Sequence, residues 1–402
     1  MKLENAINIQ DLQELARRRL PKVIYDYLAG GAEDEKTLRR NSSVFDDYLL
    51  RPRVLSAGGK VDLSTDLFGE RIGLPFLIGP TGLNGIHWSE GDIALAHAAA
   101  KANTIFSLST ASNVSMETAA QSTTGPKWFQ LYPWGDRAVL KRLLDRAKAS
   151  GYRVLVVTVD SLIGGKRERD ARNKFAHEVR LTPGVMVDGL QHPRWLTSVW
   201  LRNGMPRFEN IAEFLPVGAN ASALAEFTRN QRNAAMTWQD LEWIKGRWDG
   251  PVIVKGILTQ EDALIAQKIG LDGLVISNHG GRQLDGSVTP LEALPDIAHA
   301  VGGNMTILVD GGFRRGSDIV KALALGANAI LLGRATLFGL AAGGEAGVSR
   351  ALHILKDEVE RVMALLGCDQ ISKLTPDHLT LPPNTVPIAP IKQNSVANFR
   401  CA

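Results

Sequence analysis

Short apolar runs rich in β-branched residues recur along the chain, and amphipathic stretches separate them. Runs of this kind predict buried strands, and the stretches between them have the apolar spacing of helices. We expect helices over residues 94–101, 138–149, 261–268 and 318–325. The eight runs expected to be strands are 76–80, 105–109, 128–132, 154–160, 252–255, 273–278, 306–310 and 329–333.

Eight strands that alternate with helices indicate an α/β protein whose parallel sheet closes into a (β/α)8 TIM barrel. A doubly wound open sheet is the alternative. We expect residues 1–402 to form a single domain, with an N-terminal helical extension over 1–75 and the barrel over 76–345. A long insert at about 178–215 follows the fourth strand, and a C-terminal helix and tail cover 346–402. Such a long insert is usually functional or mobile.

Composition and charge narrow the class of protein. The chain is 45% hydrophobic and 22% charged, which is typical of a globular protein. Its net charge is +4 without a basic run, so we expect no nucleic-acid partner. Cys368 and Cys401 lack metal-site spacing and favour a reducing, cytoplasmic compartment. We expect neither a signal peptide nor a spanning helix, because no apolar stretch is long enough.

The predicted strands end in polar or glycine residues, and barrel active sites lie at the carboxyl ends of the strands. After the sixth strand, the motif from Ser277 to Gln283 contains a histidine, two glycines and an arginine. His279 can exchange a proton near neutral pH, and Arg282 can bind a carboxylate through two parallel hydrogen bonds. The motif therefore predicts catalysis, with a solvent-exposed loop pair as the alternative.

The loops after the last two strands are rich in glycine and arginine. One runs from Asp310 to Gly316 and includes Gly312 and Arg314, and the other contains Gly333 and Arg334. Backbone N–H groups, a helix N-terminus and arginine side chains together favour a phosphate group. The alternative is a pair of ordinary turns flanked by surface arginines.

Two further strand ends carry charged side chains. Lys255 ends the fifth strand, where it could neutralise an electron-rich ring, form a Schiff base or extend its ammonium into water. Asp160 ends the fourth strand, where it could orient His279, and Arg167 follows as a second possible carboxylate ligand. The sequence contains no G-x-G-x-x-G, P-loop or H-E-x-x-H motif, and we expect no metal site.

Taken together, these motifs resemble the FMN-dependent 2-hydroxy acid dehydrogenase/oxidase family over nearly the whole chain. The resemblance also covers residues 20–34, 128–132 and 321–327. It implies FMN as cofactor and oxidation of an (S)-2-hydroxy acid to the 2-oxo acid, with the Cα-carbanion and hydride routes both open. Within the family, mandelate-oxidising members are most similar, through residues 80–85 and 109–113.

The resemblance also implies a role for individual residues. His279 matches the catalytic base and Asp160 its partner. The substrate-binding residues implied are Arg167, Arg282, Tyr27 and Tyr132, the last of which is also assigned to catalysis. Lys255 matches the lysine that stabilises the anionic reduced flavin. The remaining cofactor-binding residues implied are Thr81, Gly82, Ser109, Gln130, Thr158, Ser277, Asp310, Gly312, Arg314, Gly333 and Arg334.

Small residues stand where glycolate-oxidising relatives have large ones. Ala111 replaces an aromatic residue, and Gly164 replaces a leucine in another stretch expected to line the pocket. This favours an aryl substrate, most simply mandelate oxidised to benzoylformate. L-Lactate is the second candidate, because residues 240–251 resemble lactate dehydrogenases.

The insert bears on the electron acceptor. Trp195, Leu196, Val199 and Trp200 have one-face helical spacing beside Arg194 and Arg202, so they could lie in a membrane interface. Packing on the barrel or on another subunit is the alternative. The resemblance implies peripheral association with the cytoplasmic side of the inner membrane, a quinone acceptor and a homotetramer. A soluble, oxygen-using oxidase and, more remotely, a Schiff-base barrel enzyme or a sugar-phosphate-binding protein without chemistry remain alternatives.

Overall fold

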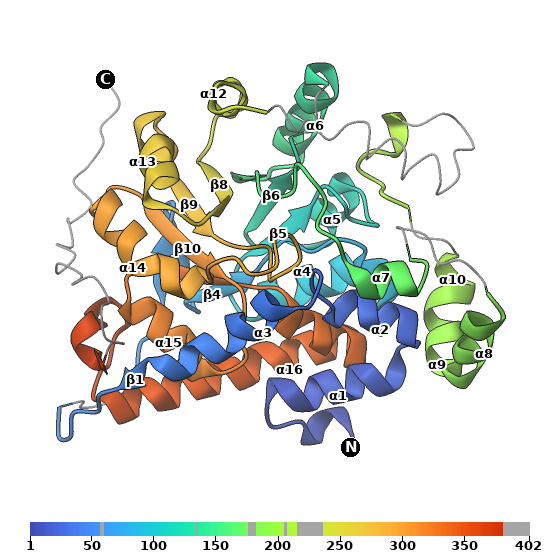
Figure 1. Ribbon diagram of the computed structural model, residues 1–402, viewed down its shortest axis with the longest axis horizontal. Coiled ribbons are helices and arrows are strands. Elements are labelled where there is room, and N and C mark those ends of the chain that lie inside the picture. The colour runs from blue at the N-terminus through green and yellow to red at the C-terminus, as the bar shows by residue number, and fades with distance from the viewer. Residues whose placement is uncertain (57–59, 134–135, 176–181, 205–206, 215–235, 381–402) are drawn as a thin grey trace.

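The computed structural model describes residues 1–56, 60–133, 136–175, 182–204, 207–214 and 236–380 (Figure 1). Its eight parallel strands form a closed barrel in the order β10-β11-β4-β5-β6-β7-β8-β9. Closure confirms the predicted barrel and excludes the open sheet. The strands are β4 (Phe76–Ile78), β5 (Phe106–Ser109), β6 (Lys127–Leu131), β7 (Val154–Thr158), β8 (Val252–Ile257), β9 (Gly273–Ile276), β10 (Thr306–Asp310) and β11 (Ala329–Leu332).

Alternating side chains of the strands build two separate apolar cores. Leu77, Trp128 and Val156 are among the residues that fill the inside of the barrel. Phe76 and Phe129, one position away, belong to the larger cluster between the strands and the helices. Because side chains alternate along a strand and both faces are buried, these strands appear in the sequence as continuous apolar runs.

Helices surround the barrel as expected, and all four predicted helices are confirmed. Several begin at capping side chains: Thr289 and Glu292, for example, form a capping box around Pro290. The long helix α16 packs against α1 and α4. The helices around the barrel are α4 (Gly91–Lys101), α5 (Met116–Ser122), α6 (Arg137–Ala149), α12 (Trp238–Lys245), α13 (Gln260–Lys268), α14 (Pro290–Val301), α15 (Gly316–Ala324) and α16 (Arg334–Leu366).

The N-terminal extension is helical only in part. It begins with η1 (Leu3–Asn5), α1 (Ile9–Arg19), α2 (Lys22–Ala29), α3 (Lys36–Ser43) and η2 (Val44–Asp47). The predicted N-terminal helices are confirmed, but the extension also contains three short strands that the sequence did not predict: β1 (Leu49–Leu50), β2 (Thr65–Leu67) and β3 (Glu70–Ile72). Phe68 and Gly69 both have positive φ, as a tight hairpin turn requires. The Phe68 ring lies 5.7 Å from that of Trp128, so this hairpin packs on the barrel interior.

The insert after β7 contains α8 (Pro183–Gln191), α9 (Pro193–Trp195), the π-helix η4 (Leu196–Trp200) and α10 (Leu201–Asn203). Residues 178–181, 205–206 and 215 of the predicted insert lie outside the described residues. Trp195 and Val199 are buried against the barrel. The Trp195 indole donates to the carbonyl of Ile86 at 2.7 Å. The packing alternative is therefore correct for these two residues, and the membrane interpretation is wrong for them, whereas Leu196 and Trp200 on the same face are only partly buried.

A different face of the insert is exposed and apolar. Met186, Val187 and Leu190 of α8 are 55%, 56% and 69% exposed, and Leu201 of α10 is 70% exposed. In the part of the chain that the structure describes, no helix has the length and apolar character needed to cross a membrane.

The remaining short elements connect the larger ones. They are η3 (Asn84–Ile86), α7 (Glu168–Arg172), η5 (Ala212–Phe214), η6 (Ile371–Lys373), η7 (Pro376–His378) and β12 (Leu379–Thr380). Strand β12, near the end of the described chain, pairs with β1.

Helix α16 is kinked, and Gly347 and Gly339 on it lie in close contact. Gly343 and Gly344 have non-helical backbone angles, and a Cβ atom built on Gly347 would lie 1.9 Å from the carbonyl oxygen of Gly339. We expect Gly347→Ala to lower the free energy of unfolding by about 1–3 kcal/mol, because backbone must move to admit the methyl group. Denaturant unfolding measures this. Gly189→Ala on α8 is the control, since no atom lies within 4 Å of its Cβ position, and an equal loss there would contradict the contact argument.

Candidate active site

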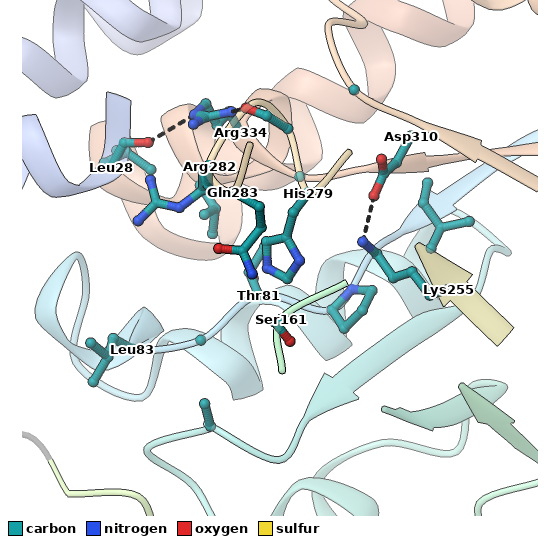
Figure 2. Close-up of a pocket in the computed structure, with 18 of the residues that line it drawn as sticks. Leu28, Thr81, Leu83, Ser161, Lys255, His279, Arg282, Gln283, Asp310 and Arg334 are labelled. Atoms are coloured by element: carbon teal, nitrogen blue, oxygen red, sulfur yellow. Dashed lines mark hydrogen bonds and ion pairs between the residues drawn. The ribbon is translucent and has the colours of Figure 1, made fainter. Parts of the chain in front are cut away.

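A pocket opens at the carboxyl ends of the barrel strands, and the predicted site residues surround it (Figure 2). Five of those residues do not line its wall: Ser109, Gln130, Thr158 and Ser277 are buried at the strand ends, and Asp160 is partly buried there. The predicted residues that line the pocket are Tyr27, Thr81, Gly82, Ala111, Tyr132, Arg167, Lys255, His279, Arg282, Asp310, Gly312, Arg314, Gly333 and Arg334. Strand ends distant in sequence, together with Tyr27 on α2 and Arg167 before α7, thus bring the predicted residues to one end of the barrel.

The loop after β9 follows a left-handed path that presents His279 to the pocket. His279, Gly280 and Gly281 have φ angles of 57°, 65° and 72°. Glycine adopts this conformation without cost, whereas a histidine is strained in it. A Cβ atom on Gly281 would also lie 2.7 Å from the backbone nitrogen of Leu38. The two glycines therefore allow both the turn and the close approach of α3.

His279 and Asp160 form a hydrogen-bonded pair. The Nδ1 atom of His279 lies 2.8 Å from Asp160 Oδ1. Burial lowers the pKa of His279, although Asp160 opposes that shift. Burial raises the pKa of Asp160, but the charges of His279 and Lys255 outweigh it and hold that pKa below its usual value. A charged Asp160 can only accept, so Nδ1 carries the proton and Nε2 the lone pair.

Lys255 is a buried cation with two carboxylate neighbours. Its Nζ atom lies 2.9 Å from Asp310 Oδ2 and 4.0 Å from Asp160 Oδ2, and donates to Ser277 Oγ at 2.7 Å. Figure 2 shows Lys255 pointing at Asp310. Burial lowers the pKa of Lys255, but Asp310 and Asp160 outweigh it and raise that pKa. Lys255 therefore stays charged within the site.

Partly buried arginines make the pocket strongly positive. Burial, aided by Arg167, lowers the pKa of Arg282 to about 10. Burial likewise lowers the pKa of Arg314 to about 10 and that of Arg334 well below its usual value. The hydrogen bonds of their guanidinium groups within the described residues run to backbone carbonyls: Arg282 donates to Tyr27 and Gly30, Arg314 to Phe313, and Arg334 to Leu28, Gly30 and Gly280. Such a site favours anionic ligands.

The loop after β10 lies tightly against α3. Gly312 has a φ of 86°, and a Cβ atom there would lie 1.8 Å from the carbonyl oxygen of Asn41. The side-chain amides of Asn41 and Asn278 exchange two hydrogen bonds of 2.8 Å. The sequence does not predict a role for Asn41, because nothing near it along the chain indicates a contact with Asn278, 237 residues away. The N-terminal extension is thus part of the site's support.

Several buried polar atoms have no protein partner within the described residues. They include Gln130 Nε2, Thr158 Oγ1 and Asp310 Oδ1. Folded proteins rarely leave such atoms unsatisfied, so they indicate a ligand with its own donors and acceptors. A flavin ring with a ribityl chain and a phosphate has the required edges, and Gly333 leaves open space where a side chain would stand. The residues present therefore fit FMN.

The wall of the pocket near β4 and β5 is mostly apolar. Ala111 lines it beside Leu83 and Phe208, as expected for a small residue that leaves room. The expectation that Gly164 also lines the pocket is wrong. The chain turns outward after Leu162, which lines the pocket, so Gly164 is exposed. Leu83, Phe208 and His87 were missed, because their burial at the wall depends on how η3 and the insert fold.

The described residues contain no group of three or more His, Cys, Asp or Glu side chains arranged to hold a metal ion. The charged groups of the site are the His279–Asp160 pair, the Lys255–Asp310 pair and the arginines. Together they can bind an anion, hold a proton and face a neutral, apolar wall.

Comparison with known proteins identifies the family. A model of the FMN-dependent dehydrogenase family matches residues 16–381. (S)-Mandelate dehydrogenase from Pseudomonas putida is 44% identical over 379 residues, 94% of each chain. L-Lactate dehydrogenase from Yersinia pestis (strain Pestoides F) is 41% identical over 372 residues, 92% of this chain and 97% of that one.

A solved structure is equally similar. The crystal structure of the monotopic membrane protein (S)-mandelate dehydrogenase has a TM-score of 0.90 and 44% identity, covering 94% of this chain and 99% of that one. The resemblance inferred from the motifs is thereby confirmed. The chain belongs to the FMN-dependent dehydrogenase family, uses FMN and oxidises 2-hydroxy acids.

Proposed function

We propose that the protein oxidises an aryl (S)-2-hydroxy acid, with (S)-mandelate as the simplest substrate and benzoylformate as its product. The observation that carries this proposal is the position of the His279–Asp160 pair relative to Ala111. The pair lies on one side of the barrel mouth, and the small side chain of Ala111 lies on the opposite side. A proton acceptor thus faces a wall with room for a ring. The electrons pass to a membrane quinone.

The substrate carboxylate would bind the positive end of the pocket. Arg282 and Arg167 both line it, and within the described residues the ion pair of Arg167 is a long one, to Asp170 at 3.9 Å. The Arg282 guanidinium lies 4.9 Å above the ring of Tyr27, which fixes its plane. Tyr27 and Tyr132 supply hydroxyl groups beside these arginines. Two guanidinium groups can hold a carboxylate in one orientation.

His279 would take the proton that leaves the substrate. Its Nδ1–H is committed to Asp160, so Nε2 is the basic atom. That proton comes either from Cα or from the hydroxyl group, and the same histidine serves both routes. Asp160 stabilises the imidazolium that results.

FMN supplies the chemistry of accepting two electrons from the substrate. Thr81, Gly82 and the buried strand-end residues Ser109, Gln130, Thr158 and Ser277 would hold its ring and side chain. Lys255 would place positive charge beside the ring. The ribityl chain and phosphate would be held by Asp310, Gly312, Arg314, Gly333 and Arg334. The unpaired atoms of Gln130, Thr158 and Asp310 support this assignment.

The raised pKa of Lys255 argues against the Schiff-base alternative. A lysine must lose its proton to attack a carbonyl, whereas Asp310 and Asp160 favour the charged ammonium. L-Lactate stays the second candidate substrate, supported by the 41% identical L-lactate dehydrogenase. The space beside Ala111 favours the larger aryl acid.

The insert supports a membrane-bound acceptor. Its exposed apolar face, Met186, Val187, Leu190 and Leu201, has Arg194 and Arg202 close by in sequence. Apolar side chains rimmed by arginine suit the interface of an anionic membrane. The similar crystal structure is that of a monotopic membrane protein. We therefore favour peripheral attachment to the cytoplasmic side of the inner membrane and a quinone over oxygen; a homotetramer stays a prediction.

The pH dependence tests the role of His279. The base acts when neutral, so kcat/KM should fall as the pH decreases through a pKa below the usual histidine value. Asp160→Asn removes the charge that raises this pKa. The acidic limb should therefore move to lower pH, and the plateau should fall by about 10²–10⁴-fold, because the imidazolium loses its partner.

Asp357→Asn is the control for that experiment, because it breaks another His–Asp pair, His353–Asp357, on the exposed surface. Its pH profile should match that of the unmodified enzyme. Retained flavin absorbance in both variants shows that the site is intact. An acidic limb that does not move in Asp160→Asn would contradict the assigned base.

Substitution of Ala111 tests the aryl substrate. Ala111→Phe should lower kcat/KM for (S)-mandelate by at least about tenfold, while that for L-lactate changes by less than about threefold, because only the ring needs this space. Anaerobic bleaching of the flavin absorbance by each acid gives both rates. If the unmodified enzyme prefers lactate, the aryl assignment is wrong even though the mechanism stands.

The membrane role can be tested at one leucine. Leu190→Glu should weaken binding to vesicles of anionic phospholipid by about tenfold. The substitution removes apolar area that would be buried in the membrane and adds a negative charge that the lipid headgroups repel. Leu365→Glu is the matched control, because Leu365 is also 69% exposed but lies on α16. Vesicle sedimentation measures both. Equal loss in the two variants would remove the insert from membrane attachment.

A further inference from the structure

His87 is a fully buried histidine at the wall of the pocket. It directly follows η3 and has 0% exposure. Its ring is stacked near that of Tyr27, with centroids 6.3 Å apart and planes 26° from parallel. His87 has no role in the proposed mechanism.

Neither ring nitrogen of His87 has a hydrogen-bond partner in the described part of the chain. Burial, aided by Arg282, lowers the pKa of His87 to about 3, so the ring is neutral at physiological pH. A neutral imidazole has one N–H donor and one acceptor nitrogen. Leaving both unpaired in a protein interior is unfavourable, which calls for an explanation such as a ligand that pairs with them.

The position of His87 indicates which ligand would reach it. In the barrel order, β5 lies opposite β9, so the wall that carries Ala111 faces the loop that carries His279. Leu83 and Phe208 complete the lining on this side, and neither has a polar side chain. A substrate held by the arginines with its reacting carbon at His279 would direct its side chain toward this wall. His87 lines the pocket together with these apolar side chains, and its imidazole supplies a polar group among them.

We propose that His87 determines specificity, and that the preferred substrate is an aryl 2-hydroxy acid with a hydroxyl group on its ring. This inference rests on the proposed aryl substrate and deepens it. A phenolic hydroxyl both donates and accepts, as the neutral imidazole does, so one substituent can pair with His87 in either tautomer. An unsubstituted phenyl ring leaves the imidazole without a hydrogen-bond partner. A buried polar group left unpaired in this way lowers kcat/KM for that substrate relative to one that pairs with it.

The test compares (S)-mandelate with its 2-, 3- and 4-hydroxy derivatives by kcat/KM. The unmodified enzyme should prefer one hydroxylated isomer over mandelate by about tenfold or more. His87→Leu should abolish that preference and leave kcat/KM for mandelate within about threefold. The corresponding methyl-substituted mandelate controls for ring size, because it fills the same space without a hydrogen bond. His353→Leu, which removes an exposed histidine on α16, should change none of these ratios.

Stability distinguishes recognition from a structural role. His87→Leu removes two unpaired buried nitrogens, so its thermal midpoint should be equal to or above that of the unmodified protein. His87→Asn keeps a donor and an acceptor at this position and should retain part of the preference. It also serves as the second variant if His87→Leu does not fold.

The outcomes separate this inference from the function on which it rests. If L-lactate is oxidised faster than every aryl acid, the proposed function fails. If mandelate is a good substrate but no hydroxylated isomer is preferred, or if the preference survives in both His87 variants, the role of His87 is overturned. Equal losses for all substrates together with a lower thermal midpoint would likewise overturn it, because they indicate structural support alone.

Discussion

The constraint on which this structure depends is the concentration of positive charge at the barrel mouth. Arg282, Arg314 and Arg334 are partly buried there, and the loss of solvent lowers the pKa of each. The C-terminal end of α2 compensates in part, since the carbonyls of Tyr27, Leu28 and Gly30 accept from Arg282 and Arg334. The negative end of a helix stabilises cations in this way. The remaining positive charge favours a carboxylate and a phosphate.

That constraint explains why the N-terminal extension belongs to the active site. Without α2 the two arginines would lose their carbonyl partners. The extension also holds the catalytic loop, because Ala32 donates to the carbonyl of Gly281 at 2.9 Å. A Cβ atom on Gly31 would lie 2.8 Å from the same oxygen, so the contact requires glycine there. The positions of Arg282 and His279 are thus coupled to how the first helices pack.

The sequence predicts the barrel and much of the site because both follow from the positions of the strands along the chain. Each buried strand is an apolar run, and a barrel gathers the residue after each run at one end. Lys255, His279 and Asp310 could therefore be placed together from their positions after strands. Two other features could not be predicted from the sequence: the unpaired nitrogens of His87 and the Asn41–Asn278 pair. Both depend on contacts between segments that are distant along the chain.

Helical periodicity also cannot determine which side of a helix is buried. The insert has apolar residues on two sides, and the sequence favoured the side of Trp195 for the membrane. The structure buries that side, because an indole N–H needs an acceptor and the carbonyl of Ile86 provides one. The exposed side of α8 was missed. Gly164 illustrates a similar limit, since a residue in a pocket-lining stretch need not point inward.

The insert combines two functions that a large deletion would not separate. Phe208 lines the substrate pocket, and the Asn210 side chain donates to the carbonyl of Ser109, at the end of β5. Asn210 also accepts from the backbone of Met116 at 2.7 Å. Removing residues 178–215 would therefore disturb a residue expected to bind the cofactor as well as the exposed face of α8. Loss of flavin after that deletion would say nothing about the membrane, whereas a change confined to the outer face leaves these inner contacts in place.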